Sequence, residues 1–223
     1  SSHRRQRQMC IRDSIKAEDV TVINAEGKYL IPGMIDDQVH FREPGLTHKG
    51  EIATESKAAI AGGVTSYFEM PNVNPNTSTI ENLEKKFDIA ANKSYANYSF
   101  YLGATNDNIE EIKKSDPNAS CGLKVLMGAS TGDLLVDKYE SLEKIFEHCP
   151  TNIVTHCEDP KRLVENENIF QEKYGDQLHA AHHAVIRDEE CCYLSSSLAV
   201  GLAKRFGANL HVLHLSTKRE MDL

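Results

Sequence analysis

The sequence lacks the features that mark membrane proteins and nucleic-acid-binding proteins. None of its apolar runs is long enough to cross a bilayer, and its first residues do not follow the pattern of a signal peptide. Its 25 lysines and arginines are outnumbered by 33 aspartates and glutamates, which gives a net charge of -8. A general nucleic-acid binder needs an excess of basic residues to neutralise phosphates. We therefore predict a cytoplasmic protein with neither nucleic-acid nor membrane partners.

Patterns typical of disulfide frameworks and zinc knuckles are also missing. The spacings of the six cysteines match no zinc-knuckle motif, and two of the cysteines are direct neighbours, which makes them a poor disulfide pair. The simplest interpretation is reduced thiols in a cytoplasmic protein. The cysteines are Cys10, Cys121, Cys149, Cys157, Cys191 and Cys192.

The first residues, 1–14, differ from the rest of the chain. They read SSHRRQRQMCIRDS, with four arginines and little apolar content, and nothing in them suggests folding. The run resembles translated sequencing-adapter sequence, so we predict a non-native or disordered basic segment. A basic arm that binds an acidic partner is the alternative.

From about Val20 onward, β-rich apolar runs alternate with amphipathic stretches. Runs such as NIVTH and LHVLHL are apolar on both faces, which suits parallel strands covered on both sides. The predicted strands are 30–40, 64–70, 98–102, 122–127, 152–156 and 210–215. The predicted helices are 51–61, 79–92, 139–148, 160–174 and 187–206.

This alternation predicts βα units and an α/β fold with a parallel sheet. A doubly wound sheet and a (β/α)₈ barrel both fit the alternation. The sequence contains no GxGxxG or Walker loop for a nucleotide crevice. Polar residues gather instead at the carboxyl ends of several strands, where barrel enzymes keep their chemistry. We therefore predict a TIM-type barrel that is truncated after about six strands.

The segment 32–45, PGMIDDQVHFREPG, resembles the first barrel strand of the dihydroorotases, which belong to the amidohydrolase superfamily. The likeness continues through AGGVTSYFEMPNVNP, GLKVLMGASTG, IVTHCE and HVLHLST, in the order of the family. The resemblance implies a partial metal-dependent amidohydrolase barrel over 30–223. It also implies that 15–29 are the remnant of a flanking small β domain.

The first of these motifs carries an incomplete metal pair. By resemblance, His40 is the second histidine of a His-x-His pair, and that spacing places both side chains on one face of a strand. The first position holds Gln38, whose amide oxygen can contact a cation but is a poor zinc ligand beside imidazole. Asp36 shares this face and is interpreted as a supporting residue, whereas Asp37 is expected on the opposite face.

The other metal ligands are also assigned by the resemblance. Lys124 lies in an apolar strand, where a charged lysine is costly. Carboxylated by carbon dioxide, it would become an anionic ligand that bridges two cations; a lysine that snorkels at the strand edge is the alternative. His156 and His214 would hold the second metal position, and His211 is interpreted as structural. The implied cofactor is zinc, as one or two ions.

Two further residues are implied to bind the substrate. Arg42 and Asn72 would hold the one free carboxylate of the substrate ring, because a guanidinium forks two donors onto a carboxylate. The alternatives are a salt bridge from Arg42 to Glu43 and a turn-forming role for Asn72.

The resemblance implies reversible, zinc-dependent hydrolysis of the cyclic amide of dihydroorotate to N-carbamoyl-aspartate, in de novo pyrimidine biosynthesis. The proton-transferring aspartate is expected beyond Leu223, so the catalytic residue stays unknown and this fragment alone is expected to be inactive. One alternative is a catalytically impaired structural partner of a pyrimidine-pathway enzyme, which Gln38 favours. Another is a hydantoinase or allantoinase, against which Arg42 argues. A homodimer or a pathway-enzyme partner is expected.

Overall fold

The chain divides into two compact units, Ser1–Pro32 and Gly33–Leu223. The computed structural model describes residues 21, 23–128 and 132–223. The described part of the first unit contains a turn, in which the amide of Lys28 donates to the carbonyl of Ala25. The predicted basic segment lies outside the described residues, and the small β domain stays a prediction.

The second unit contains a six-stranded sheet in which each strand pairs in parallel with the next one along the chain. A doubly wound sheet would reverse its strand order, and this sheet does not. The predicted TIM-type barrel architecture, with about six strands in this chain, is therefore confirmed. The strands are β1 (Met34–Val39), β2 (Val64–Glu69), β3 (Asn97–Gly103), β4 (Gly122–Leu126), β5 (Ile153–His156) and β6 (Leu210–Val212).

Helices connect the strands, as βα units require. Two of them have the predicted bounds, and the two four-residue helices were not predicted because one helical turn carries no periodic signal. No helix in the described part of the chain is long and apolar enough to span a membrane. The helices are α2 (Ile52–Ala61), α3 (Ile80–Lys93), α4 (Ile109–Ile112), α5 (Tyr139–His148), α6 (Pro160–Tyr174), α7 (His183–Ile186) and α8 (Glu189–Phe206).

The outer face of the sheet packs against these helices. Leu123 and Val125 of β4 are fully buried and lie in one cluster with Phe146 of α5 and Leu202 of α8. A second cluster surrounds Tyr67 of β2, between α2 and α3. Alternate strand residues therefore point outward into apolar cores, which leaves the other face of each strand for the inside of the barrel.

The inner face is curved, and its residues come from opposite edges of the sheet. Tyr101 of β3 and Val154 of β5 belong to a small inner cluster. The Tyr101 hydroxyl donates to the carbonyl of Asp37 in β1 at 3.0 Å. The Asp37 carboxylate in turn lies 3.6 Å from His211 Nε2 in β6. The first and last strands of the sheet therefore approach each other, as in half of a barrel.

An irregularity in β1 affects the basis of one expectation from the sequence. The pairing with β2 shifts register between Asp36 and Val39, so regular alternation does not hold across this segment. The amide of Gln38 donates to the side chain of Asp36 at 3.0 Å inside the irregular segment. The expectation that Gln38 and His40 share a strand face rested on regular alternation. The pairing of β1 with β2 is not regular in this segment, so the shared face stays a prediction.

A buried ion pair joins the end of β2 to α3. Glu69 and Lys86 have fully buried side chains, and the Lys86 ammonium lies 3.2 Å from Glu69 Oε2. The ammonium also donates to the carbonyl of Met70 at 2.9 Å, and Glu69 Oε1 accepts the amide of Arg42 at 3.0 Å. Burial raises the pKa of Glu69 and lowers the pKa of Lys86. Each of the two buried side chains therefore keeps its charge because the other one is beside it.

Replacing Lys86 with methionine is expected to lower the free energy of unfolding by about 3–5 kcal/mol, because it leaves a buried carboxylate unpaired. Chemical denaturation measures the change. Lys85→Met is the matched control, since the Lys85 ammonium pairs with Glu81 at the surface and such pairs contribute little. Equal stability of the two variants would contradict the prediction. Adding Glu69→Gln to Lys86→Met should recover stability, because the amide oxygen still accepts from Arg42.

Candidate functional site

The polar residues singled out in the sequence lie at the carboxyl ends of the strands and form two groups. His40 and Asn72 meet beyond the ends of β1 and β2, whereas His156 and His214 meet at β5 and β6. Lys124 is in β4, between the two groups in the strand order. Parallel strands put their carboxyl ends on one edge of a sheet, which explains how residues far apart in sequence share one rim.

In the first group, His40 Nδ1 lies 2.9 Å from Asn72 Oδ1. An amide oxygen only accepts, so Nδ1 carries the hydrogen and Nε2 keeps its lone pair. Desolvation, together with the nearby charge of Arg42, lowers the pKa of His40 to about 4. The imidazole is therefore neutral at pH 7, and its Nε2 is free to bind a cation. Asn72 keeps its two amide hydrogens for another acceptor.

In the second group, His156 Nδ1 lies 3.1 Å from His214 Nε2. The backbone of His214 has a φ of 38°, and β6 has already ended at Val212. This departure from strand geometry lets His214 turn to His156, although His211 already uses the inner face of β6. Burial, and then the neighbouring His156, lower the pKa of His214. The two ring nitrogens are close enough to bind a single cation together.

Lys124 is buried, with 3% of its surface exposed. It pairs in register with Gly103 of β3 and Val154 of β5, so it is in the middle of the sheet. The snorkelling alternative, which needs an edge strand and an exposed ammonium, is wrong. Desolvation lowers the pKa of Lys124 to about 7, so a neutral amine is accessible at neutral pH. The charge of Lys124 also contributes to the lowered pKa values of both His40 and His214.

The two predicted metal positions, at β1 and at the histidine pair of β5 and β6, differ in how well their side chains suit zinc. Across residues 23–128 and 132–223, no three His, Cys, Asp or Glu side chains gather as a metal site. The histidine pair on β5 and β6 supplies two imidazoles, and Lys124 can add a third donor once it has lost its proton. The β1 position supplies one imidazole, from His40, with Gln38 in an irregular strand. The observed groups therefore fit one zinc position better than two.

Arg42 is held through its backbone, and its guanidinium has no carboxylate partner among the described residues. Its φ of 71° is in the left-handed region, and its amide is fixed by Glu69. The salt bridge to Glu43 that was an alternative does not form. Glu43 is buried and binds Lys93 instead, and it accepts the amide of Ile52 at 2.9 Å. Arg42 is therefore available to an external anion.

Sequence reasoning missed the charged residues behind these groups. Glu158 Oε2 lies 2.6 Å from His156 Nε2, and Arg187 pairs with the same carboxylate. Desolvation opposes the charge of Glu158, but the Arg187 guanidinium lowers the pKa of this carboxyl to about 2. The only signal in the sequence was Glu158, two residues after His156 in IVTHCE. Nothing in the sequence indicated that Arg187 would be its partner.

A recess of about 280 Å³ opens beside the histidine pair. This volume is near the lower end of small-molecule sites. Besides His156 and His214, it is lined by Glu158, His183, Arg187, Cys192, Ser216 and Glu220. The described cysteines are free thiols, and Cys10 lies outside the described residues.

Comparison with known proteins identifies the family of this chain. Residues 27–220 match the family model described as dihydro-orotase-like. An allantoinase from Streptomyces avermitilis is 33% identical over 87% of this chain and 43% of its own length. A dihydroorotase from Methanosarcina mazei is 32% identical over 88% of this chain and 42% of its own. A dihydroorotase from Carboxydothermus hydrogenoformans is 33% identical over 96% of this chain and 48% of its own length. The chain therefore spans less than half the length of these relatives.

Solved structures share the fold. An L-hydantoinase from Arthrobacter aurescens superposes with a TM-score of 0.84 and 26% identity, over 93% of this chain and 47% of its own. A dihydropyrimidinase from Brevibacillus agri superposes with a TM-score of 0.78 and 25% identity, over 94% of this chain and 46% of its own length. Because the family model covers most of the sequence, this chain belongs to the dihydro-orotase-like family.

Proposed function

We propose that the chain is part of a cyclic amide hydrolase that opens and closes the ring of dihydroorotate, with N-carbamoyl-aspartate as the ring-opened product, in pyrimidine biosynthesis. The observation that carries the proposal is Arg42. Its guanidinium has no carboxylate partner among the described residues, and its charge acts on His40 at the same strand ends. A carboxylate on the substrate ring would give this cation the partner that the described residues do not.

The proposed cofactor is zinc, held by His156, His214 and Lys124, with His40 as the ligand on the β1 side. Bound zinc would supply a Lewis acid that activates water and polarises the ring amide. The chain itself supplies neutral imidazoles, since the pKa values of His40 and His214 are both lowered. Neutral imidazole is the form that binds a metal.

Lys124 would take part as a carbamate. Its neutral amine would attack carbon dioxide, form an N–C bond and release one proton, which leaves an anionic group with two oxygen donors. The lowered pKa of Lys124, about 7, supports this role because the amine must first lose its proton. The exchange replaces a buried cation with an anion that carries oxygen donors, which favours binding of a metal cation.

The substrate carboxylate would lie between Arg42 and Asn72. The Asn72 oxygen is engaged by His40, so its amide hydrogens are the donors that remain. Arg42 would donate two parallel hydrogen bonds to this carboxylate, and Asn72 would donate one. The His40–Asn72 bond would also link substrate binding to the β1 metal ligand.

An allantoinase is the second candidate, because the relative from Streptomyces avermitilis carries that name. The ring of hydantoin-type substrates has no carboxylate, so it would leave Arg42 without a partner. Substrate comparison distinguishes the two candidates. A third possibility is a relative that has lost turnover, and it predicts a protein that binds no zinc.

Replacing Arg42 with alanine in the full-length protein is expected to lower kcat/KM for dihydroorotate about 100-fold, since a charged partner of the carboxylate is lost. Turnover of hydantoin should change little. Arg42→Lys is the control: it keeps the charge but loses the fork, so an intermediate loss is expected. Steady-state kinetics with both substrates measures this. A parent protein that prefers allantoin or hydantoin to dihydroorotate would overturn the proposal.

Replacing His214 with alanine is expected to remove zinc from the purified protein, because one of two converging imidazoles is lost. His211→Ala is the matched control, since His211 lies in β6, three residues before His214, but faces Asp37. Elemental analysis of the two variants gives the zinc content per chain. Zinc retained in His214→Ala, or lost equally in both variants, would contradict the assignment.

A further inference from the structure

We propose that Glu158 and Arg187 act together as positioning residues that hold His156 in one tautomer and one orientation. The inference rests on the proposed function, because it concerns the residues behind a proposed zinc ligand. It goes beyond that function by naming a pair of charged residues that would hold a zinc ligand in place without binding zinc themselves.

The contacts of the two ring nitrogens of His156 define its tautomer. Nε2 lies 2.6 Å from Glu158 Oε2, and an ionised carboxylate only accepts hydrogen bonds. Nε2 therefore carries the hydrogen and donates it to Glu158. Nδ1 keeps its lone pair, and it is the nitrogen that faces His214 Nε2 at 3.1 Å. The carboxylate thus presents the lone pair on the side where the two imidazoles converge.

Glu158 is itself fixed by two contacts from one guanidinium. Arg187 Nε donates to Oε1 at 2.5 Å, and Nη2 donates to Oε2. Only 6% of the Glu158 surface is exposed, so water cannot readily replace either contact. The Oε2 atom that accepts from His156 is also held by Arg187. The carboxylate cannot turn away from the histidine without breaking a buried, bidentate ion pair.

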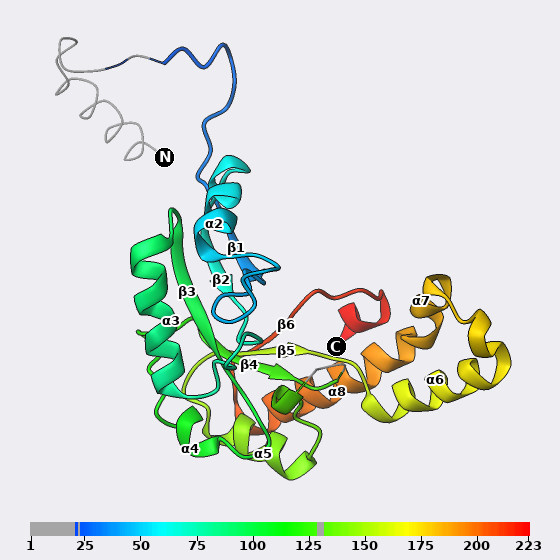
Figure 1. Ribbon diagram of the computed structural model, residues 1–223. Coiled ribbons are helices and arrows are strands. Elements are labelled where there is room, and N and C mark those ends of the chain that lie inside the picture. The colour runs from blue at the N-terminus through cyan, green and yellow to red at the C-terminus, as the bar shows by residue number, and fades with distance from the viewer. Residues whose placement is uncertain (1–20, 22, 129–131) are drawn as a thin grey trace. The chain divides into compact units, whose positions relative to one another are not determined.

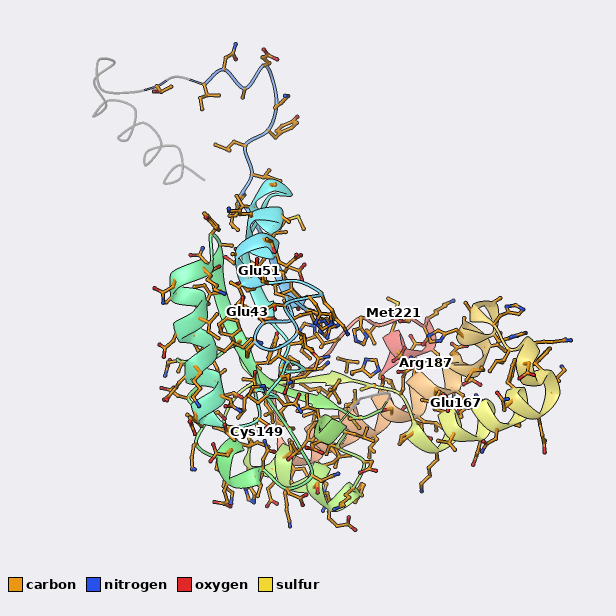
Figure 2. The ribbon with its side chains drawn as sticks, in the orientation of Figure 1. Glu43, Glu51, Cys149, Glu167, Arg187 and Met221 are labelled. Carbon is orange, nitrogen blue, oxygen red and sulfur yellow. The ribbon has the colours of Figure 1, made fainter. Side chains whose placement is uncertain are left out.

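Arg187 comes from a part of the chain that is otherwise peripheral. It joins α7 to α8, and α6 has no buried residue. Figure 2 labels Arg187 where the chain returns from α6 and α7, and it labels Glu167 on α6. The next residue, Asp188, caps α8 by accepting the amide of Cys191 at 3.0 Å. The position of Arg187 is therefore fixed by the start of α8.

The same junction contains a second ion pair that does not reach the histidine. Arg162 of α6 donates through Nε to Asp188 Oδ1 at 2.8 Å and through Nη2 to Oδ2 at 2.5 Å. The two ion pairs are both bidentate and involve adjacent residues, Arg187 and Asp188. Only the Arg187 pair touches a carboxylate bound to His156. The Arg162 pair is therefore a matched control for loss of an ion pair at this junction.

The test compares Glu158→Gln, Arg187→Gln and Arg162→Gln in the purified protein. Long-range ¹H–¹⁵N NMR of the metal-free protein reports the tautomer of His156, and chelator competition gives the zinc dissociation constant. A glutamine amide can donate as well as accept, so Glu158→Gln no longer enforces hydrogen on Nε2. We expect the Nδ1–H tautomer to appear in this variant and zinc affinity to fall about 10–100-fold. Arg187→Gln should act in the same direction, and Arg162→Gln should change neither readout.

An unchanged His156 tautomer in Glu158→Gln would overturn the inference, as would zinc affinity that falls equally in Arg162→Gln. If Glu158→Gln does not fold by circular dichroism, Arg187→Gln decides, because it leaves Glu158 in place but unanchored. A parent protein that binds no zinc would refute the proposed cofactor. The tautomer measurement would still test the inference in that case, so the two failures are distinguishable.

Discussion

Parallel pairing of the six strands in chain order is the constraint on which the rest of the structure depends. It sends every strand in the same direction, so the residues that follow the strands collect at one rim. Curvature then brings β1 and β6 within contact distance through Asp37 and His211. Figure 1 shows the strands β1 to β6 with the helices that connect them. His40 and His214, which are far apart in sequence, lie at the same rim for this reason.

Buried carboxylates hold the segments that carry the site, and each has its own basic partner. Glu43 binds Lys93, Glu69 binds Lys86, and Glu158 binds an arginine. Each carboxylate also accepts a hydrogen bond from the site or its loop. A charge in an apolar core is stable only with such partners, so the ion pairs fix the loops as well as neutralising the charge. The rim is therefore positioned by electrostatic contacts as well as by apolar packing.

The two sides of the rim differ in chemistry. The β5–β6 side has two imidazoles that face each other, whereas the β1 side has one imidazole and a neutral amide in an irregular strand. Lys124, between them, has a pKa lowered to about 7 by burial. The β1 side instead carries Arg42, a cation without a carboxylate partner among the described residues. The proposals of metal binding on one side and recognition of a carboxylate on the other rest on this division.

The sequence by itself determined the parallel α/β fold and the residues at the strand ends, because apolar periodicity and the polar residues after each strand are local features. It also determined the bounds of α5 and α6, the second of which begins at Pro160. Tertiary structure alone decided the irregular register of β1, the turn of His214 toward His156, and the partner of each buried carboxylate. Those features depend on contacts between residues distant in sequence, such as Glu158 with Arg187, and no local pattern encodes which distant charge will be adjacent after folding.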